Sequence, residues 1–137
     1  MNVLFVCRFN KVRSKLAAAF FNKYADKHSA KSAGIVKGSA VDDKMKSIAK
    51  RHGVSVGGVS KSITVPLLRW HDIMVIVADD IPRSLFAKEE KKYGKALYHW
   101  KIKDKAEASA KESDRMAKEI EKQVKRLISR IMRSAPK

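Results

Sequence analysis

The segment that most constrains the fold of this chain is residues 3–14, VLFVCRFNKVRS. It opens with an unbroken apolar run rich in β-branched residues, which is typical of a strand buried inside a parallel sheet. A short polar stretch follows, and from Leu16 onward apolar side chains recur at helical spacing. A strand, a tight loop and a helix start predict a phosphate-binding loop, in which backbone N–H groups and the helix N-terminus converge on one anion.

The only cysteine of the chain, Cys7, stands where this strand ends, and Arg13 precedes the helical pattern. The loop amides and the Arg13 guanidinium favour the thiolate form of Cys7, so Cys7 is the candidate nucleophile. The planar fork of Arg13 matches two phosphoryl oxygens. The spacing of these two residues is not specific alone, and it gains meaning from their place between a strand and a helix. A buried, purely structural cysteine is the alternative.

The rest of the chain alternates strand and helix patterns, without a hairpin signal between them. Strands are expected at 2–7, 31–35, 73–78 and 96–100. The first helix is expected from Leu16, and the second runs from a cap at Asp42 or Asp43 to Gly53. A short helix follows Thr64 as its N-cap, and another follows Pro82 with Leu85 and Phe86 facing inward. The last helix carries an apolar stripe from Met116 to Ile131. This order predicts a single α/β domain over residues 1–137. It has three α/β/α layers, a four-stranded parallel sheet, and the phosphate-binding loop after the first strand.

Charge is the other marked property, with 31 Lys and Arg against 14 Asp and Glu and a formal net charge of +17. Such an excess invites a nucleic-acid interpretation. The lysines are spread along the chain, however, aromatic residues do not interleave with them, and no nucleic-acid-binding motif occurs. The interpretation favoured is a solvated basic surface that attracts anionic substrates, with nucleic acid only as a non-specific partner.

Other features narrow the class of protein further. One cysteine excludes an internal disulfide, and no Cys/His cluster has the spacing of a metal site, so neither a metal nor a cofactor is expected. A core strand begins at once, without a signal peptide, and no apolar run is long enough to cross a membrane. We therefore expect a cytoplasmic protein with no membrane partner.

The residues Val6-Cys7, Asn10 and Arg13-Ser14 resemble the loop signature of the low-molecular-weight protein tyrosine phosphatases, Cys-x-Gly-Asn-x-x-Arg-Ser. The related thioredoxin-coupled arsenate reductases share that fold and loop. The resemblance extends along nearly the whole chain. It includes Ser32-Ala33-Gly34, Gly53-Val54, Ser60, the helix over 64–70, Asp72 with the strand over 73–78, and Asp104.

This resemblance implies a role for each matching residue. Cys7 would form a phosphocysteine intermediate, and Arg13 would clamp the phosphate. Asn10 would brace the loop, and Ser14 would hydrogen-bond the Cys7 thiolate and stabilise it as a leaving group. Asp104 would be the general acid, and then the base for the attacking water. The rival acids Asp79 and Asp80 follow a different strand and rank behind Asp104, whose own alternative is a solvated acid in a lysine-rich loop.

The substrate would meet the loop itself. Its candidate binding residues are Arg8, Phe9, Asn10, Lys11, Val12 and Arg13. Substrates would be tyrosine-phosphorylated proteins or small aryl phosphates, with phosphate and vanadate as inhibitors.

Three positions depart from the family pattern. Phe9 replaces the loop glycine and must point outward or narrow the mouth, Val12 replaces a second cysteine, and Lys105 replaces the proline after the acid. A protective disulfide in the loop is therefore impossible, and the acid loop is less rigid. Phe9 and Trp100 are the aromatic residues left to form a pocket wall, so the preference for phosphotyrosine stays open.

Two other functions remain as alternatives. An arsenate reductase of the thioredoxin-coupled kind needs further cysteines, so this chain would have to use an external thiol. A phosphate- or nucleic-acid-binding module with a degenerate loop would need neither a nucleophile nor an acid. The presence of Cys7, Arg13, Ser14 and Asp104 argues against such a module.

Overall fold

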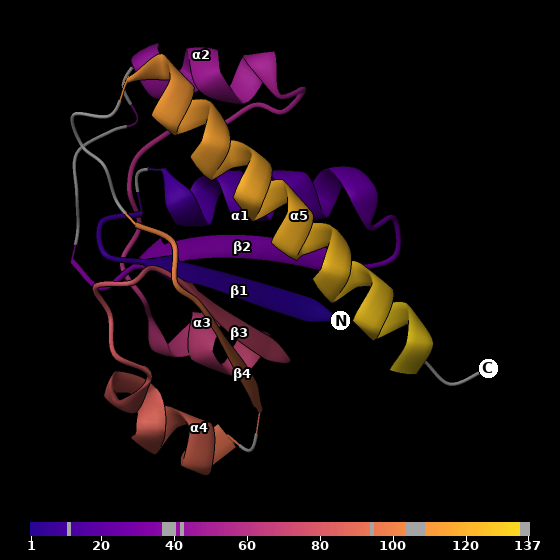
Figure 1. Cartoon of the computed structure of the whole chain (residues 1–137). Coiled ribbons are helices and arrows are strands. Elements are labelled where there is room, and N and C mark those ends of the chain that lie inside the picture. The colour runs from indigo at the N-terminus through magenta and orange to yellow at the C-terminus, as the bar shows by residue number, and fades with distance from the viewer. Residues whose placement is uncertain (11, 37–40, 42, 94, 104–108, 135–137) are drawn as a thin grey trace.

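The structure is a computed structural model that describes residues 1–10, 12–36, 41, 43–93, 95–103 and 109–134 (Figure 1). The elements in order are β1 Asn2–Cys7, α1 Arg13–Tyr24, β2 Ser29–Gly34, α2 Asp43–Arg51, α3 Val65–Trp70, β3 Ile73–Val77, η1 Arg83–Phe86, α4 Ala87–Tyr93, β4 Ala96–Trp100 and α5 Ala110–Ser134.

The sheet has four strands in the order β2-β1-β3-β4, and every neighbouring pair is parallel. This confirms the predicted parallel sheet. Since all four strands run the same way, their carboxyl ends share one edge, at the left of Figure 1, where β1 ends at Cys7. Ligands of open parallel sheets bind beyond such an edge.

The helices cover both faces of the sheet (Figure 1). Side chains of β1 alternate between the two faces, as a strand's period of two requires. Val3 and Phe5 join a core with α1, α2 and α5, whereas Leu4 and Val6 join a second core with α3 and η1. The three-layer α/β/α architecture is therefore as the sequence predicts.

Two expectations need correction. Strand β2 runs over Ser29–Gly34 instead of 31–35, because pairing with β1 starts at Asn2 opposite Ser29. Leu85 does not face inward: it is 50% exposed, whereas Phe86 is 5% exposed. Both lie in the 3-10 turn η1, where successive side chains diverge by about 120° and neighbours cannot share one face.

Helix ends follow the expected local chemistry. The Thr64 hydroxyl accepts a hydrogen bond from the Leu67 N–H at 3.3 Å and caps α3. Asp42 and Asp43 are the two caps proposed for α2; Asp43 is its first helical residue, and Asp42 lies outside the described residues. Gly53, after the end of α2, has φ +79°. None of the described helices is both long and apolar enough to cross a bilayer.

Candidate active site

The loop after β1 joins Cys7, the last residue of that strand, to Arg13, the first residue of α1. Both residues are only 2% exposed, and Ser14 is fully buried. The predicted succession of strand, tight loop and helix start is therefore present, with the cysteine in front of the N-terminus of α1.

Three side chains form a buried chain of hydrogen bonds at this loop. Cys7 Sγ lies 3.0 Å from the Ser14 hydroxyl, which accepts from Asn10 Nδ2 at 2.9 Å. The orientation of the Asn10 amide follows from its other contact, because the backbone N–H of Lys61 donates to Oδ1 at 2.9 Å. Since Ser14 accepts from Asn10, its own proton is available to the sulfur, which is the arrangement that stabilises a thiolate.

Asn10 also has an unusual backbone conformation, with φ +53°. Asparagine is one of the few non-glycine residues that adopt this left-handed region readily. The side chain of Asn10 is fully buried in the hydrogen bonds just described. Its contacts are therefore with the loop and with Lys61, so Asn10 holds the loop's shape from within.

Gly34, at the end of β2, packs directly against the loop. A Cβ at this position would lie 2.8 Å from the backbone nitrogen of Asn10 and 2.9 Å from the carbonyl carbon of Phe9. The chain after Gly34 continues this support, because Ile35 N–H donates to the Cys7 carbonyl and Val36 N–H donates to the Arg8 carbonyl. The second strand thus forms the floor of the loop, and only glycine fits there.

The Arg13 guanidinium is held by two segments from the same sheet edge. Its Nη1 donates to Asp80 Oδ1 at 3.1 Å and to the Ile102 carbonyl at 2.9 Å, and Asp79 Oδ1 lies 3.9 Å away. Sequence reasoning treated Asp79 and Asp80 as rival acids and missed their contact with Arg13. The contact arises from the sheet order, because β3, which precedes these two aspartates, lies next to β1.

Asp80 is electrostatically suited to bind a cation, not to donate a proton. Partial burial opposes its ionisation, but the hydrogen bond and charge of Arg13, helped by Arg8, outweigh this and lower the pKa of Asp80 below its ordinary value. A lower pKa leaves a smaller fraction of this carboxyl protonated at any given pH, so Asp80 is a poorer proton donor than an unperturbed aspartate. This weakens Asp80 as a rival to Asp104.

The rim of the loop carries a stacked pair of side chains. The Arg8 guanidinium lies 5.4 Å from the centre of the Phe9 ring, and its Nη1 is 3.8 Å from Asp80 Oδ2. Phe9 is 37% exposed, so its ring points away from the buried interior of the loop. Trp100, the other aromatic residue proposed for a pocket wall, packs instead against Phe5, with ring centres 5.7 Å apart.

The remaining candidates are less informative. Val12 is partly buried against the core on the α1 side of the sheet. Lys11 and Asp104 lie outside the described residues.

Lysines beside the loop add positive charge that sequence reasoning did not single out. Lys15 Nζ donates to the carbonyls of Gly57 and Val59 at 3.0 and 3.2 Å. Its pKa is lowered by burial and by the charge of Lys61, while Cys7 acts in the opposite direction. Lys15, Lys61 and Cys7 are therefore close enough to interact electrostatically, and the two lysines favour an anion beside the loop. Among the described residues, no three His, Cys, Asp or Glu side chains gather as a metal ion would require.

A parallel sheet whose first strand delivers a buried cysteine to an arginine-bearing loop fits a cysteine-based phosphatase. The chain belongs to the low molecular weight phosphotyrosine protein phosphatase family, whose model matches residues 2–137. Among curated proteins, none matches the sequence significantly.

Solved structures of several proteins share the fold. The low molecular weight protein tyrosine phosphatase from T. tengcongensis matches with a TM-score of 0.83 and 23% identity, covering 95% of this chain and 99% of that one. YwlE arginine phosphatase from Geobacillus stearothermophilus matches with a TM-score of 0.79 and 19% identity, covering 99% and 98%. An arsenate reductase from Archaeoglobus fulgidus matches with a TM-score of 0.74 and 27% identity, covering 93% and 98%.

Proposed function

We propose that the protein hydrolyses phosphate monoesters through a phosphocysteine intermediate, with tyrosine-phosphorylated proteins and small aryl phosphates as its substrate class. The observation that supports this most directly is the contact of 3.0 Å between Cys7 Sγ and the Ser14 hydroxyl, in front of the helix that Arg13 begins. A loop that only bound anions would need neither the thiol nor the hydroxyl placed to stabilise it.

In the first step, the Cys7 thiolate attacks phosphorus, and the bond from phosphorus to the ester oxygen breaks. Asp104 gives its proton to that departing oxygen. Arg13 and the loop N–H groups bind the phosphoryl oxygens, whose charge is spread in the transition state. The contact of Asp80 and Ile102 with Nη1 orients the Arg13 fork for this role.

In the second step, water attacks phosphorus while Asp104 takes its proton, and the bond between sulfur and phosphorus breaks. Ser14 donates a hydrogen bond to the thiolate that leaves, and inorganic phosphate is released. The role of Asp104 rests on its match to the family pattern. Further support comes from Ile102, two residues earlier in the sequence, which accepts a hydrogen bond from Arg13.

Phe9 supports an aryl substrate, because it offers an exposed apolar ring beside the loop. The thiol must stay reduced for this chemistry, which supports a cytoplasmic location. Arsenate reduction is the second candidate, supported by the match to the arsenate reductase. The sequence has one cysteine, so arsenate reduction would have to form a disulfide between Cys7 and an external thiol.

The test is hydrolysis of p-nitrophenyl phosphate by the wild type, Cys7→Ser and Cys7→Ala, each with and without EDTA. We expect activity only in the wild type, unaffected by EDTA and inhibited by vanadate and phosphate. Activity that survives in Cys7→Ala would overturn the proposal. Phosphotyrosine and phosphoarginine peptides, and arsenate with glutathione, then determine the substrate class.

A further inference from the structure

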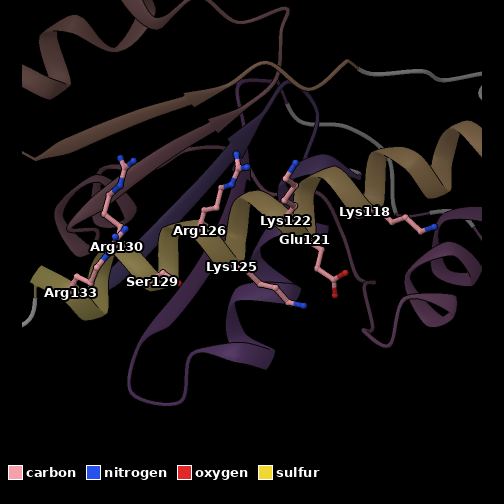
Figure 2. Close-up of a pocket in the computed structure, with 8 residues that line it drawn as sticks. All are labelled: Lys118, Glu121, Lys122, Lys125, Arg126, Ser129, Arg130 and Arg133. Carbon is pink, nitrogen blue, oxygen red and sulfur yellow. The ribbon is translucent and has the colours of Figure 1, made fainter.

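The outer face of α5 carries two rows of side chains at helical spacing. One row consists of Lys118, Lys122, Arg126 and Arg130, and the other of Glu121, Lys125, Ser129 and Arg133. We call the first of these the basic row. Together the two rows line a solvent-facing hollow of about 580 Å³, from which the side chains splay outward (Figure 2). Glu121 is half-buried, and the other seven are exposed.

The basic row contains no acidic side chain. Like charges four residues apart on a helix repel each other. In the part of the chain that the structure describes, Lys118, Lys122 and Arg126 form no ion pair. The single acid of the hollow, Glu121, accepts a hydrogen bond from the Tyr24 hydroxyl at 2.6 Å. An external polyanion would relieve this repulsion.

The shape of the basic row favours an elongated anion over a small one. At 1.5 Å per residue, Lys118 and Arg130 are separated by about 18 Å along the helix axis. A small phosphorylated compound would reach one or two of these cations, whereas a linear polyanion could follow all four. The hollow also lies apart from the Cys7 loop, since α5 runs away from that edge of the sheet toward its C-terminus (Figure 1).

An anionic membrane and an acidic protein fit this face less well than nucleic acid does. Binding in a membrane interface requires an exposed apolar face, but the apolar side chains of α5 are buried in the core, with Met132 as an exposed exception. The cores of protein–protein interfaces are depleted of lysine and enriched in aromatic residues, whereas the hollow is lined by lysine and arginine. A nucleic-acid backbone needs only positive side chains in a line.

We propose that this face of α5 binds the phosphate backbone of nucleic acid without sequence preference, at a site separate from the Cys7 loop. The basic residues are scattered in the sequence, but the helical repeat collects them into one row. The proposal is independent of the proposed phosphatase activity, and each can fail without the other.

The test compares two variants of equal charge. Lys118→Gln, Lys122→Gln and Arg126→Gln together neutralise the basic row, and Lys88→Gln, Lys91→Gln and Lys92→Gln together remove the same charge from α4, on the other face of the sheet (Figure 1). Binding to a fluorescent 20-base-pair duplex of random sequence is measured by anisotropy between 50 and 200 mM salt. Thermal unfolding is measured for every variant.

We expect the wild type to bind with a micromolar Kd at low salt, as sequence-independent binding does. The basic-row variant should bind about tenfold or more weakly. Its plot of log binding constant against log salt should flatten by about 2.7, which is about 0.9 for each lost phosphate contact. The α4 variant should differ from the wild type by less than about threefold, with little change in slope.

Equal weakening in both triple variants would overturn the proposal, because net charge alone would then account for binding. Absence of binding at 50 mM salt would also overturn it. The proposal would also be overturned if the basic-row variant lost binding to vesicles with anionic lipid but kept its binding to the duplex. A membrane would then be the partner of this face. If the triple variant unfolds, Lys122→Gln and Arg126→Gln are tested singly, each with an expected slope change of about 0.9.

Discussion

Arg13 and Asp80 form a contact between α1 and the segment that follows β3. The 3.1 Å hydrogen bond between them is partly exposed, since the Asp80 side chain is 32% accessible. Because Arg13 lowers the pKa of Asp80, the bond stabilises the folded protein at every pH above the carboxyl's ordinary value of 3.8. This stabilisation is lost as the pH falls below 3.8 through the folded-state pKa.

We therefore predict that Asp80→Asn is less stable than the wild type at pH 6, and that the difference shrinks progressively as the pH falls below about 4. Urea unfolding between pH 6 and pH 2.5 measures this. Asp79→Asn is the comparison: Asp79 Oδ1 lies 3.9 Å from Arg13 Nη1, within ion-pair reach but beyond hydrogen-bonding distance, so its loss should have a smaller effect than the loss of Asp80. A stability difference for Asp80→Asn that stays constant down to pH 2.5 would contradict the prediction.

Asp104 is predicted to matter in proportion to the leaving group's need for a proton. Asp104→Asn should slow hydrolysis of phenyl phosphate by roughly a hundred- to ten-thousand-fold. The penalty on formation of the phosphocysteine should be much smaller with a p-nitrophenyl leaving group. Burst kinetics with both esters measure it, with Asp79→Asn as the comparison. If Asp79→Asn is the slow variant and Asp104→Asn is not, the acid belongs to the loop after β3.

At the scale of elements, β2 supports the loop after β1 through Gly34. We predict that Gly34→Ala destabilises the protein by about 1–3 kcal/mol, as overpacking at a backbone contact does, and lowers kcat, because the added methyl must displace the backbone at Phe9 and Asn10. Urea unfolding and turnover measure both effects. Gly57→Ala is the control, since its added Cβ would meet only Lys46 Cε at 3.9 Å. Equal stability and equal turnover of the two variants would show that the loop can shift to accommodate a methyl group at position 34.

The elements differ in how far their sequences predicted them. Strands β1 and β3 are unbroken apolar runs and were found at nearly their observed bounds. Strand β2 has the sequence SAKSAG, which contains few hydrophobic residues. Its bounds are set by pairing with β1, so the hydrophobic pattern does not predict where it starts.

The candidate site also combines features that the local sequence predicts with contacts that only the assembled fold creates. The loop, its cysteine and its arginine are local in sequence and were predicted. The contact of Arg13 with Asp80 joins residues 67 positions apart and depends on the order of the strands, which a single sequence does not contain. The left-handed backbone of Asn10 is equally a product of the assembled loop.

At the scale of the whole molecule, the net charge of +17 should steer anionic substrates toward the protein. We predict that, at low salt, an acidic phosphotyrosine peptide has a higher kcat/KM than a basic peptide with the same residues flanking the phosphotyrosine. The ratio should fall toward one as salt rises from 20 to 300 mM, because exposed charges are screened. Steady-state kinetics over this range measure it. A ratio that does not change with salt would place the preference in direct contacts at the site.

The single cysteine of the chain determines how the proposed active site would respond to oxidants. Peroxide converts a reactive thiolate into a sulfenic acid, which a second thiol normally captures as a disulfide before further oxygen is added. Cys7 has no such neighbour, since Val12 occupies the place of the family's second loop cysteine and the sequence holds no other. Peroxide should therefore inactivate the enzyme in a way that dithiothreitol reverses only at early times. Mass spectrometry should then find sulfinic and sulfonic acid at Cys7, unless an external thiol such as glutathione is present to cap it.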